Sequence, residues 1–219
     1  MEQHLTTIQI ISVSILPILF AVTVHEVAHG YAAYLLGDQT ARVLGRLTLN
    51  PVKHIDIFGT IIVPATLLLL NAGVVLGWAK PVPINPYNFK HPRRDSQLVA
   101  LAGPASNFIM AIIWGGILKG SFILFEHNIP GALAIIEMSK IGIIINLVLM
   151  VFNLLPLPPL DGGHIVAGLL PKKLAYRYEQ IAPFGFFILL LLVSIGVVGM
   201  VVNPIISFLW RFIVLLFGL

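Results

Sequence analysis

The sequence contains no cysteine. A disulfide framework and a thiolate metal site are therefore both excluded, and any metal must be held by His, Asp or Glu. Charge is scarce as well, since charged residues make up 10% of the 219 residues and hydrophobic residues 58%. The net charge of +4 is modest and comes from short basic loops between apolar segments, so it gives no support to nucleic-acid binding.

Long apolar runs are what the sequence has in abundance. Its mean hydropathy is +0.98, and several runs are long enough to cross the hydrocarbon core of a bilayer. We therefore expect an all-α polytopic membrane protein with about five to six membrane segments. We expect the protein to be embedded in the lipid bilayer.

One apolar run carries the pattern His25-Glu26-Val27-Ala28-His29. On a helix, His25 and His29 lie one above the other, so both imidazoles can reach one metal ion with Glu26 beside it. Imidazole suits Zn²⁺, and a third protein ligand leaves one position open for a water whose proton Glu26 can take. A chance match is the alternative, but ionisable groups at membrane depth cost roughly 2.5 to 3.5 kcal/mol each, which favours a functional role. The pattern predicts a zinc hydrolase site.

The chain is expected to form a single membrane domain over residues 1–219. Its catalytic core covers about 8–171, and two C-terminal apolar runs follow at 182–202 and 204–219. A basic stretch at 172–177 separates the two parts.

Within the core, the apolar pattern predicts helices at 8–36, 95–118 and 132–155. Residues 40–50 are polar and β-branched between glycine turn signals, which predicts a short β-hairpin. Residues 77–86 contain three prolines and are expected to be extended.

Residues 57–77 form an apolar segment that hydropathy alone would assign to a transmembrane helix. Basic loops lie on both of its flanks, and loops rich in Lys and Arg tend to lie on one side of the membrane. We therefore expect this segment to dip into the membrane and return, turning near 71–73. The alternative is a full crossing, with residues 78–86 threading back through the membrane.

A third metal ligand remains to be found. Asp161 is the best candidate, because it follows a proline break at membrane depth and precedes a glycine pair. His164, Asp56 and His54 are the other candidates. Asp161 could instead cap the next short helix.

Three motifs follow one another in the sequence: His25 to Gly30, Ala102-Gly-Pro-Ala-Ser-Asn107, and Asn153-Leu-Leu-Pro-Leu-Pro-Pro-Leu-Asp161-Gly-Gly. In this order they resemble the site-2 protease family of intramembrane zinc metalloproteases, peptidase family M50. The stretches 45–56 and 77–86 look like those of a bacterial and archaeal branch that has neither a PDZ nor a CBS domain.

The resemblance implies one zinc per chain, with Glu26 as general base and three ligands: His25, His29 and Asp161. It also implies that Asn153 and Pro156 help to hold a substrate strand.

Two asparagines have simpler explanations beside these roles. Asn153 can cap its own helix. Asn107 is a candidate for bracing the site or for binding substrate, while packing between helices explains it equally well.

The resemblance implies a zinc metalloendopeptidase that cleaves transmembrane proteins or peptides within or near their membrane segments. A substrate helix hides its carbonyls in hydrogen bonds and must be unwound first, and an extended strand of the enzyme can then pair with it. A catalytically silent scaffold and a zinc transporter are the alternatives. A homo-oligomer or an adaptor remains possible as a partner.

Ten of the thirteen Lys and Arg residues lie in the loops 38–56, 78–95 and 171–180. This distribution predicts that the loops are cytoplasmic. We expect the inner or plasma membrane of a prokaryotic cell, with the active site reached from the cytoplasmic side.

Overall fold

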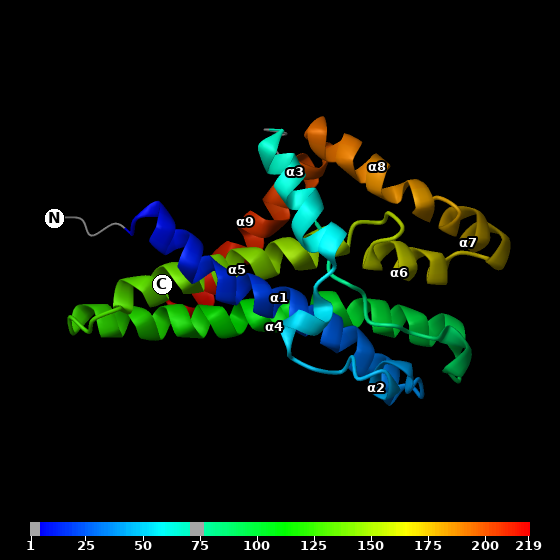
Figure 1. Cartoon of the computed structure of the whole chain (residues 1–219), viewed down its shortest axis with the longest axis horizontal. Coiled ribbons are helices and arrows are strands. Elements are labelled where there is room, and N and C mark those ends of the chain that lie inside the picture. Colours follow the sequence, from blue (N-terminus) through cyan, green and yellow to red (C-terminus); the bar gives the residue numbers. More distant parts are fainter. Residues whose placement is uncertain (1–4, 71–76) are drawn as a thin grey trace.

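The computed structural model describes residues 5–70 and 77–219 (Figure 1). Nine α-helices lie in this part of the chain: α1 (Thr7–Leu35), α2 (Thr40–Val43), α3 (Val63–Leu69), α4 (Pro92–Glu126), α5 (Ala132–Asn153), α6 (Asp161–Leu169), α7 (Lys172–Glu179), α8 (Ala182–Ser194) and α9 (Val197–Phe217). Two short 3₁₀-helices, η1 (Pro51–His54) and η3 (Pro86–Asn88), and one π-helix, η2 (Ile57–Ile62), complete the described structure. No β-strand occurs in these ranges.

Four of these helices, α1, α4, α5 and α9, are long and apolar enough to cross a membrane. The described residues hold up to five spans if α7 and α8, which are bent by 63° at their junction, are one broken span. The sequence predicted five to six membrane segments, and the described residues contain at most five.

The centre of the molecule is formed by α1, α4 and α5, which pack on one another and run side by side along its long axis (Figure 1). Helix α9 packs across α4 and α5. One close contact joins Trp114 of α4 to Gly142 of α5, where a Cβ would lie 2.4 Å from the indole ring. Because lipid is as apolar as leucine, such close approach at small residues, and not water exclusion, holds membrane helices together. The buried cluster at this interface comprises Ala111, Trp114, Leu118, Ile136, Ile143, Leu147 and Ile213.

The first predicted helix is confirmed almost to the residue, since α1 begins at Thr7 and ends at Leu35. Leu36 is the C-cap residue, and Gly37 after it adopts the left-handed φ of +110°, which ends the helix. The second predicted helix, 95–118, was placed too short. Helix α4 begins at Pro92, because proline suits a first turn, and continues to Glu126. Lys119 lies within it and donates from Nζ to the carbonyl of Gly218, 2.9 Å away, at the end of α9.

The predicted β-hairpin at 40–50 is not found in the described chain. Its first part is the helical turn α2, and the rest is irregular. The cause is Asp38, a fully buried carboxylate that accepts hydrogen bonds from the backbone N–H and the hydroxyl of Thr40. Such a local bond offers the backbone an alternative to strand pairing.

Asp38 also binds the chain that returns toward α4. It accepts from the Asn85 N–H at 2.7 Å and from the Asn88 side-chain amide at 2.7 Å. Burial alone would raise the pKa of Asp38, but the hydrogen bonds from Thr40, Asn85 and Asn88 favour the carboxylate and bring the pKa below its usual value. The end of α1 is thereby tied to residues 85–88.

The C-terminal break was predicted in the wrong place. The sequence suggested a boundary near Asn203, where polar Asn203 and Pro204 interrupt the apolar text. In the structure α8 ends at Ser194 and α9 begins at Val197, and Gly196 between them has φ +81°. Pro204 lies inside α9. The left-handed conformation, which glycine adopts without steric cost, decides the break.

The two ends of the apolar segment 57–77 meet. The N–H of Trp78 donates to the carbonyl of Gly59 at 3.1 Å, and the N–H of Lys80 donates to the carbonyl of His54 at 2.9 Å. Gly59 lies against the indole of Trp78, where a Cβ would come within 2.4 Å of the ring. The chain therefore comes back to the place it left. The predicted turn at 71–73 lies outside the described residues.

Candidate metal centre

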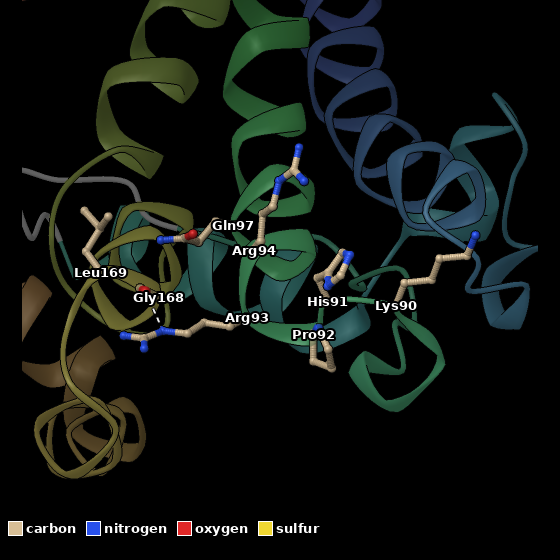
Figure 2. A pocket seen from close by; sticks show the side chains of 8 residues that line it. All are labelled: Lys90, His91, Pro92, Arg93, Arg94, Gln97, Gly168 and Leu169. Carbon is tan, nitrogen blue, oxygen red and sulfur yellow. Dashed lines mark hydrogen bonds between the residues drawn. The ribbon is translucent and has the colours of Figure 1, made fainter.

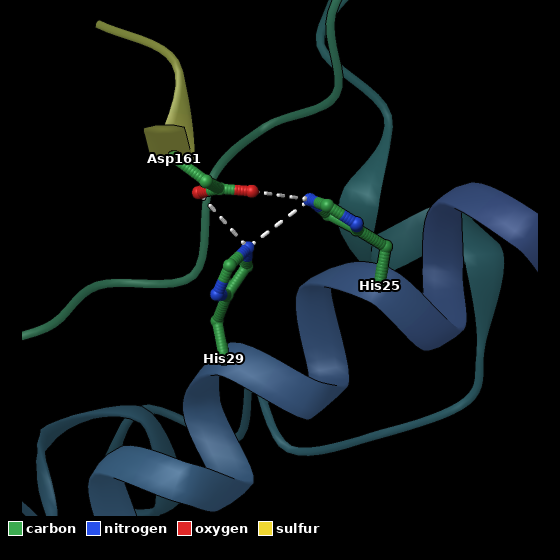
Figure 3. Close-up of side chains that lie close together, drawn as sticks. All are labelled: His25, His29 and Asp161. Atoms are coloured by element: carbon green, nitrogen blue, oxygen red, sulfur yellow. Dashed lines mark hydrogen bonds and ion pairs between the residues drawn. The ribbon is translucent and has the colours of Figure 1, made fainter. Parts of the chain in front are cut away.

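Helix α1 presents both histidines of the H-E-x-x-H pattern on one side (Figure 3). The Nε2 atoms of His25 and His29 lie 3.1 Å apart, and the two rings are nearly perpendicular at 87°. Both side chains are buried. The spacing of one helical turn thus brings two imidazole nitrogens to one point, as the sequence predicted.

Asp161, the first residue of α6, completes a group of three with these histidines (Figure 3). Its Oδ2 lies 3.3 Å from Nε2 of His25, and its Oδ1 lies 3.3 Å from Nε2 of His29. One ligand atom from each residue falls within 4.8 Å of the others. Ligand atoms of a tetrahedral zinc with bonds near 2.0 to 2.1 Å are about 3.3 Å apart, so the three side chains already have a suitable spacing.

The glycine pair after Asp161 allows α6 to begin here. A Cβ on Gly162 would lie 2.3 Å from the carbonyl oxygen of Leu154, and one on Gly163 would lie 2.5 Å from the backbone nitrogen of Pro158. The first turn of α6 therefore packs directly on the loop that leaves α5. Close packing, in addition to backbone freedom, explains the two glycines.

The outer nitrogens of the histidines have partners that settle which atoms carry protons. Nδ1 of His29 lies 2.7 Å from the carbonyl of Val99, which can only accept, so this nitrogen donates. Nδ1 of His25 lies 2.6 Å from Oδ1 of Asn107. The amide of Asn107 is oriented by its Nδ2, which donates to the carbonyl of Ala21 at 3.1 Å and to Oδ1 of Asn146 at 2.9 Å. In neutral imidazoles both Nε2 atoms are therefore acceptors that face Asp161.

A divalent cation fits this arrangement. Two neutral imidazole nitrogens and a carboxylate converge, and all three are acceptors. Oδ2 of Asp161 is buried and has no hydrogen-bond donor in the described part of the chain. A buried carboxylate oxygen without a donor is costly unless a cation is present. The N, N, O donor set suits Zn²⁺.

Gly103, in the Ala102 to Asn107 motif of α4, lies at the metal group. A Cβ at this position would lie 2.3 Å from Nε2 of His29 and 2.6 Å from Cε1 of His25. Helix α4 thus passes the two imidazoles without room for a methyl group. The Ala102-Gly103-Pro104 motif was the signal that could have revealed this contact.

Glu26 is half-buried on α1 beside the histidines. Its Oε2 accepts a hydrogen bond of 2.9 Å from the backbone N–H of Val82. Nothing in the local sequence of either residue indicated this contact.

The other ligand candidates lie away from the cluster. His164 is exposed. His54 is buried, with its Nε2 at 2.9 Å from the carbonyl of Thr48. Asp56 accepts from the N–H of Gly59 at 2.7 Å at the start of η2. In the described chain the only group suited to a metal is His25, His29 and Asp161.

Asn153 is the last residue of α5, and its Nδ2 donates to the carbonyl of Leu149 in its own helix at 2.9 Å. Pro156 is exposed in the loop that leads to Asp161. Asn107, in contrast, is fully buried, and all its polar atoms are engaged.

An open hollow of about 540 Å³ lies apart from the metal group, between the start of α4 and the end of α6 (Figure 2). Its edge is tied by a hydrogen bond of 2.7 Å from Nε of Arg93 to the carbonyl of Gly168. Gly168 is about 10 Å along α6 from Asp161. The hollow is lined by Lys90, His91, Pro92, Arg93, Arg94, Gln97, Gly168 and Leu169. None of these residues belongs to the metal group.

The chain is similar to known proteins that are named as zinc metalloproteases. Residues 120–193 match the family model "Peptidase family M50". The chain is 43% identical over 185 residues to the protein named "Putative zinc metalloprotease YwhC" of Bacillus subtilis, a match that covers 81% of this chain and 78% of the relative. No solved structure matches the chain significantly.

Two further relatives are more distant. The protein named "Putative zinc metalloprotease Rip2" of Mycolicibacterium smegmatis is 26% identical over 174 residues, which cover 80% of this chain and 63% of the relative. "Zinc metalloprotease MJ0392" of Methanocaldococcus jannaschii is 32% identical over 113 residues, which cover 51% of this chain and 31% of the relative. The chain therefore spans less than two thirds of the length of these two proteins.

An integral membrane fold, a His-His-Asp group whose two histidines are buried, and relatives named as zinc metalloproteases agree on the class of membrane metalloproteases. The chain belongs to peptidase family M50, the site-2 protease family of zinc metalloproteases.

Proposed function

We propose that the chain is an intramembrane zinc metalloprotease that hydrolyses peptide bonds within or near transmembrane segments of its substrates. One zinc per chain is held by His25, His29 and Asp161. The observation that carries this proposal is the convergence of His25, His29 and Asp161, whose ligand atoms lie within 4.8 Å of one another, together with the buried Oδ2 of Asp161, which has no hydrogen-bond donor among the described residues. His25 and His29 lie within α1, which is long and apolar enough to cross a membrane, and this supports cleavage inside the membrane.

The chemistry divides between the metal and Glu26. When bound, zinc lowers the pKa of a coordinated water and polarises a peptide carbonyl. Glu26 takes a proton from the attacking water and delivers it to the leaving amine. Its Oε1 accepts no hydrogen bond in the described chain, so this oxygen is available for the proton.

Asn107 and Val99 keep the histidines in the state that binds metal. By accepting from Nδ1 of His25 and His29, they hold each Nε2 toward Asp161. Asn107 has no free polar atom for a substrate. We therefore assign Asn107 to the orientation of His25 and not to substrate binding.

The substrate is a membrane protein or peptide whose helix is locally unwound, because helical carbonyls are hidden in hydrogen bonds. In this proposal Asn153, the last residue of α5, and Pro156, in the loop between α5 and Asp161, hold the unwound strand. Residues 80–85, which belong to no helix, also offer the carbonyl of Val82 and the N–H of Ile84, neither of which is bonded in the described chain. Pairing through these groups would add a strand beside Glu26.

The active site faces the cytoplasmic half of a prokaryotic inner or plasma membrane in this proposal. The basic loops support this orientation, because hydrogen bonds join them at one end of the molecule. Nη2 of Arg46 donates to the carbonyl of Lys80 at 3.0 Å. Nε of Arg93 donates to the carbonyl of Gly168, near the start of α7. In Figure 1 the end of α1, the start of α4, α6 and α7 lie together at the right. The meeting of Gly59 and Trp78 supports a re-entrant segment 57–77 on that side.

Residues 1–219 act as one catalytic domain in this proposal. Helix α8 packs on the loop before Asp161, where a Cβ on Gly185 would lie 2.0 Å from the carbonyl of Pro158. Helix α9 packs on α4 and α5. The C-terminal helices thus support the loop that carries the third ligand.

Replacement of Glu26 tests the function. Purified Glu26→Gln protein in liposomes is expected to keep its zinc and to cleave no membrane substrate, because glutamine cannot accept the proton. Substrates are found by comparing membrane-protein fragments between cells that express the wild type and cells that express Glu26→Gln. A scaffold or a zinc transporter would keep its activity in this variant, and undiminished cleavage would refute the role of Glu26.

A further inference from the structure

Residues 80–85 lie before α4 in the chain. Their N-terminal end is held by residues that follow α1. The N–H of Lys80 donates to the carbonyl of His54 at 2.9 Å. Nη2 of Arg46 donates to the carbonyls of Lys80 and Pro81 at 3.0 and 3.3 Å. Three hydrogen bonds therefore set the position of the chain immediately before Val82.

The downstream side is fixed by the end of α1. The carboxylate of Asp38 accepts from the N–H of Asn85 and from the side chain of Asn88, each at 2.7 Å. Asp38 is fully buried, so these bonds are shielded from water. Val82 lies between two anchored points.

Val82 has the only backbone N–H in the run Pro81-Val82-Pro83. A residue before proline is restricted to extended conformations, so Pro83 limits the directions that this N–H can take. In the structure it points at Glu26, with 2.9 Å between the nitrogen and Oε2. The prolines thus hold one donor in place and remove its two neighbours.

The stretch that contains Val82 lies directly on α1. Val82 is 5% exposed and packs on Gly30, one residue beyond His29. A Cβ on Gly30 would lie 2.7 Å from Cγ1 of Val82 and 2.7 Å from Cδ2 of Leu47. The absence of a side chain at Gly30 lets residues 80–85 lie close enough to reach Glu26.

We propose that the backbone N–H of Val82 is a positioning group for the general base, which holds Glu26 by Oε2 and leaves Oε1 to receive the proton. This inference rests on the proposed function of Glu26. A preorganised donor reduces the number of orientations that the carboxylate samples before proton transfer. It therefore acts on the chemical step and does not contribute to zinc binding.

The variant that removes this one donor is Val82→Pro, because proline lacks the N–H and suits an extended run between two prolines. A lost hydrogen bond to a charged group corresponds to a fall in kcat of about ten- to a hundredfold. KM and bound zinc are expected to stay within about twofold of wild type, since the free energy lost belongs to the chemical step. A merely structural defect would lower zinc content or thermal stability together with kcat.

One control variant accompanies it. Val82→Ala keeps the N–H and shortens the side chain, and it is expected to retain most of the wild-type kcat. If Val82→Pro fails to fold, the α-hydroxy analogue of valine at position 82 replaces the N–H by an ester oxygen and keeps the side chain.

The outcomes separate this inference from the proposed function. If Glu26→Gln is inactive and Val82→Pro or its ester equivalent keeps the wild-type kcat, the positioning role of Val82 is wrong and the role of Glu26 stands. If Glu26→Gln cleaves like the wild type, the proposed function itself fails. A selective fall of kcat in Val82→Pro, with Val82→Ala near wild type, establishes the inference.

Discussion

A methyl group at Gly103 is expected to disrupt the metal site without touching a ligand. In Gly103→Ala the new Cβ would lie 2.3 Å from Nε2 of His29, while ordinary contacts begin at 3.4 Å. The imidazole must then move by about 1.1 Å, whereas zinc sites tolerate deviations of about 0.2 Å. His25 is displaced too, because its Cε1 would lie 2.6 Å from the same methyl group.

The size of the effect follows from the role of both rings. Loss of a partner that only orients a ligand weakens metal binding by about 10- to 100-fold, so displacement of two ligands should cost at least about 100-fold. Helix propensity acts in the opposite direction, since alanine is favoured over glycine by roughly 1 kcal/mol within a helix. A loss of zinc therefore cannot come from weaker helix formation.

The assay is competition for zinc between the purified protein in detergent and a chromophoric chelator. Gly120→Ala is the matched control, because Gly120 also lies in α4 and a Cβ there would meet nothing within 4 Å. Gly120→Ala should bind zinc like the wild type. Equal zinc affinity in Gly103→Ala and Gly120→Ala would refute the packing of α4 against the two histidines.

Three further predictions concern other contacts. Asn107→Ala should lower zinc affinity about 10- to 100-fold in the same competition assay, because Nδ1 of His25 loses its acceptor; unchanged affinity would contradict the bracing role. The pKa of Asp38 is below its usual value, so its contribution to stability is complete above about pH 4 and is lost as the pH falls through the folded-state pKa. Thermal unfolding between pH 7 and pH 3 should therefore show a larger loss of stability in the wild type than in Asp38→Asn, and equal losses would oppose this. Because the chain has no cysteine, His91→Cys and His127→Cys each introduce a single label site at opposite ends of α4: an impermeant maleimide should reach position 127 from outside and position 91 only after permeabilisation, and the reverse pattern would overturn the orientation.

Local spacing made part of the site predictable. His25, Glu26 and His29 follow from one helical turn, and a helix at this place follows from the apolar run around them. Asp161 could be favoured over His164 because a carboxylate after a proline break can be aimed into the membrane interior, and the structure brings it to the histidines. In these cases the information lies within a few residues of the group itself.

Contacts between distant segments explain what the sequence did not reveal. The approach of Gly103 to the imidazoles and the bond from Val82 to Glu26 join residues far apart in the chain. No local pattern distinguishes a glycine that packs on a ligand from one that packs on another helix. The sequence shows which residues these are, but it does not show which residues they contact.

The wrong predictions have the same origin. The stretch after Gly37 looks like a hairpin because of its composition, but Asp38 binds the backbone of Thr40 and turns the chain into α2. Helix α4 was placed too short because Lys119 resembles a loop residue, whereas its ammonium group reaches the carbonyl of Gly218. In both cases one polar side chain has a partner that composition does not identify.

The most direct test of the account is the zinc content of three purified proteins: the wild type, Asp161→Ala and His164→Ala. Asp161 contacts both histidines, while His164 is exposed and lies outside the group. We predict one zinc per chain in the wild type and in His164→Ala, and a loss of zinc by orders of magnitude in Asp161→Ala. If His164→Ala loses its zinc and Asp161→Ala retains it, the metal centre described here is wrong.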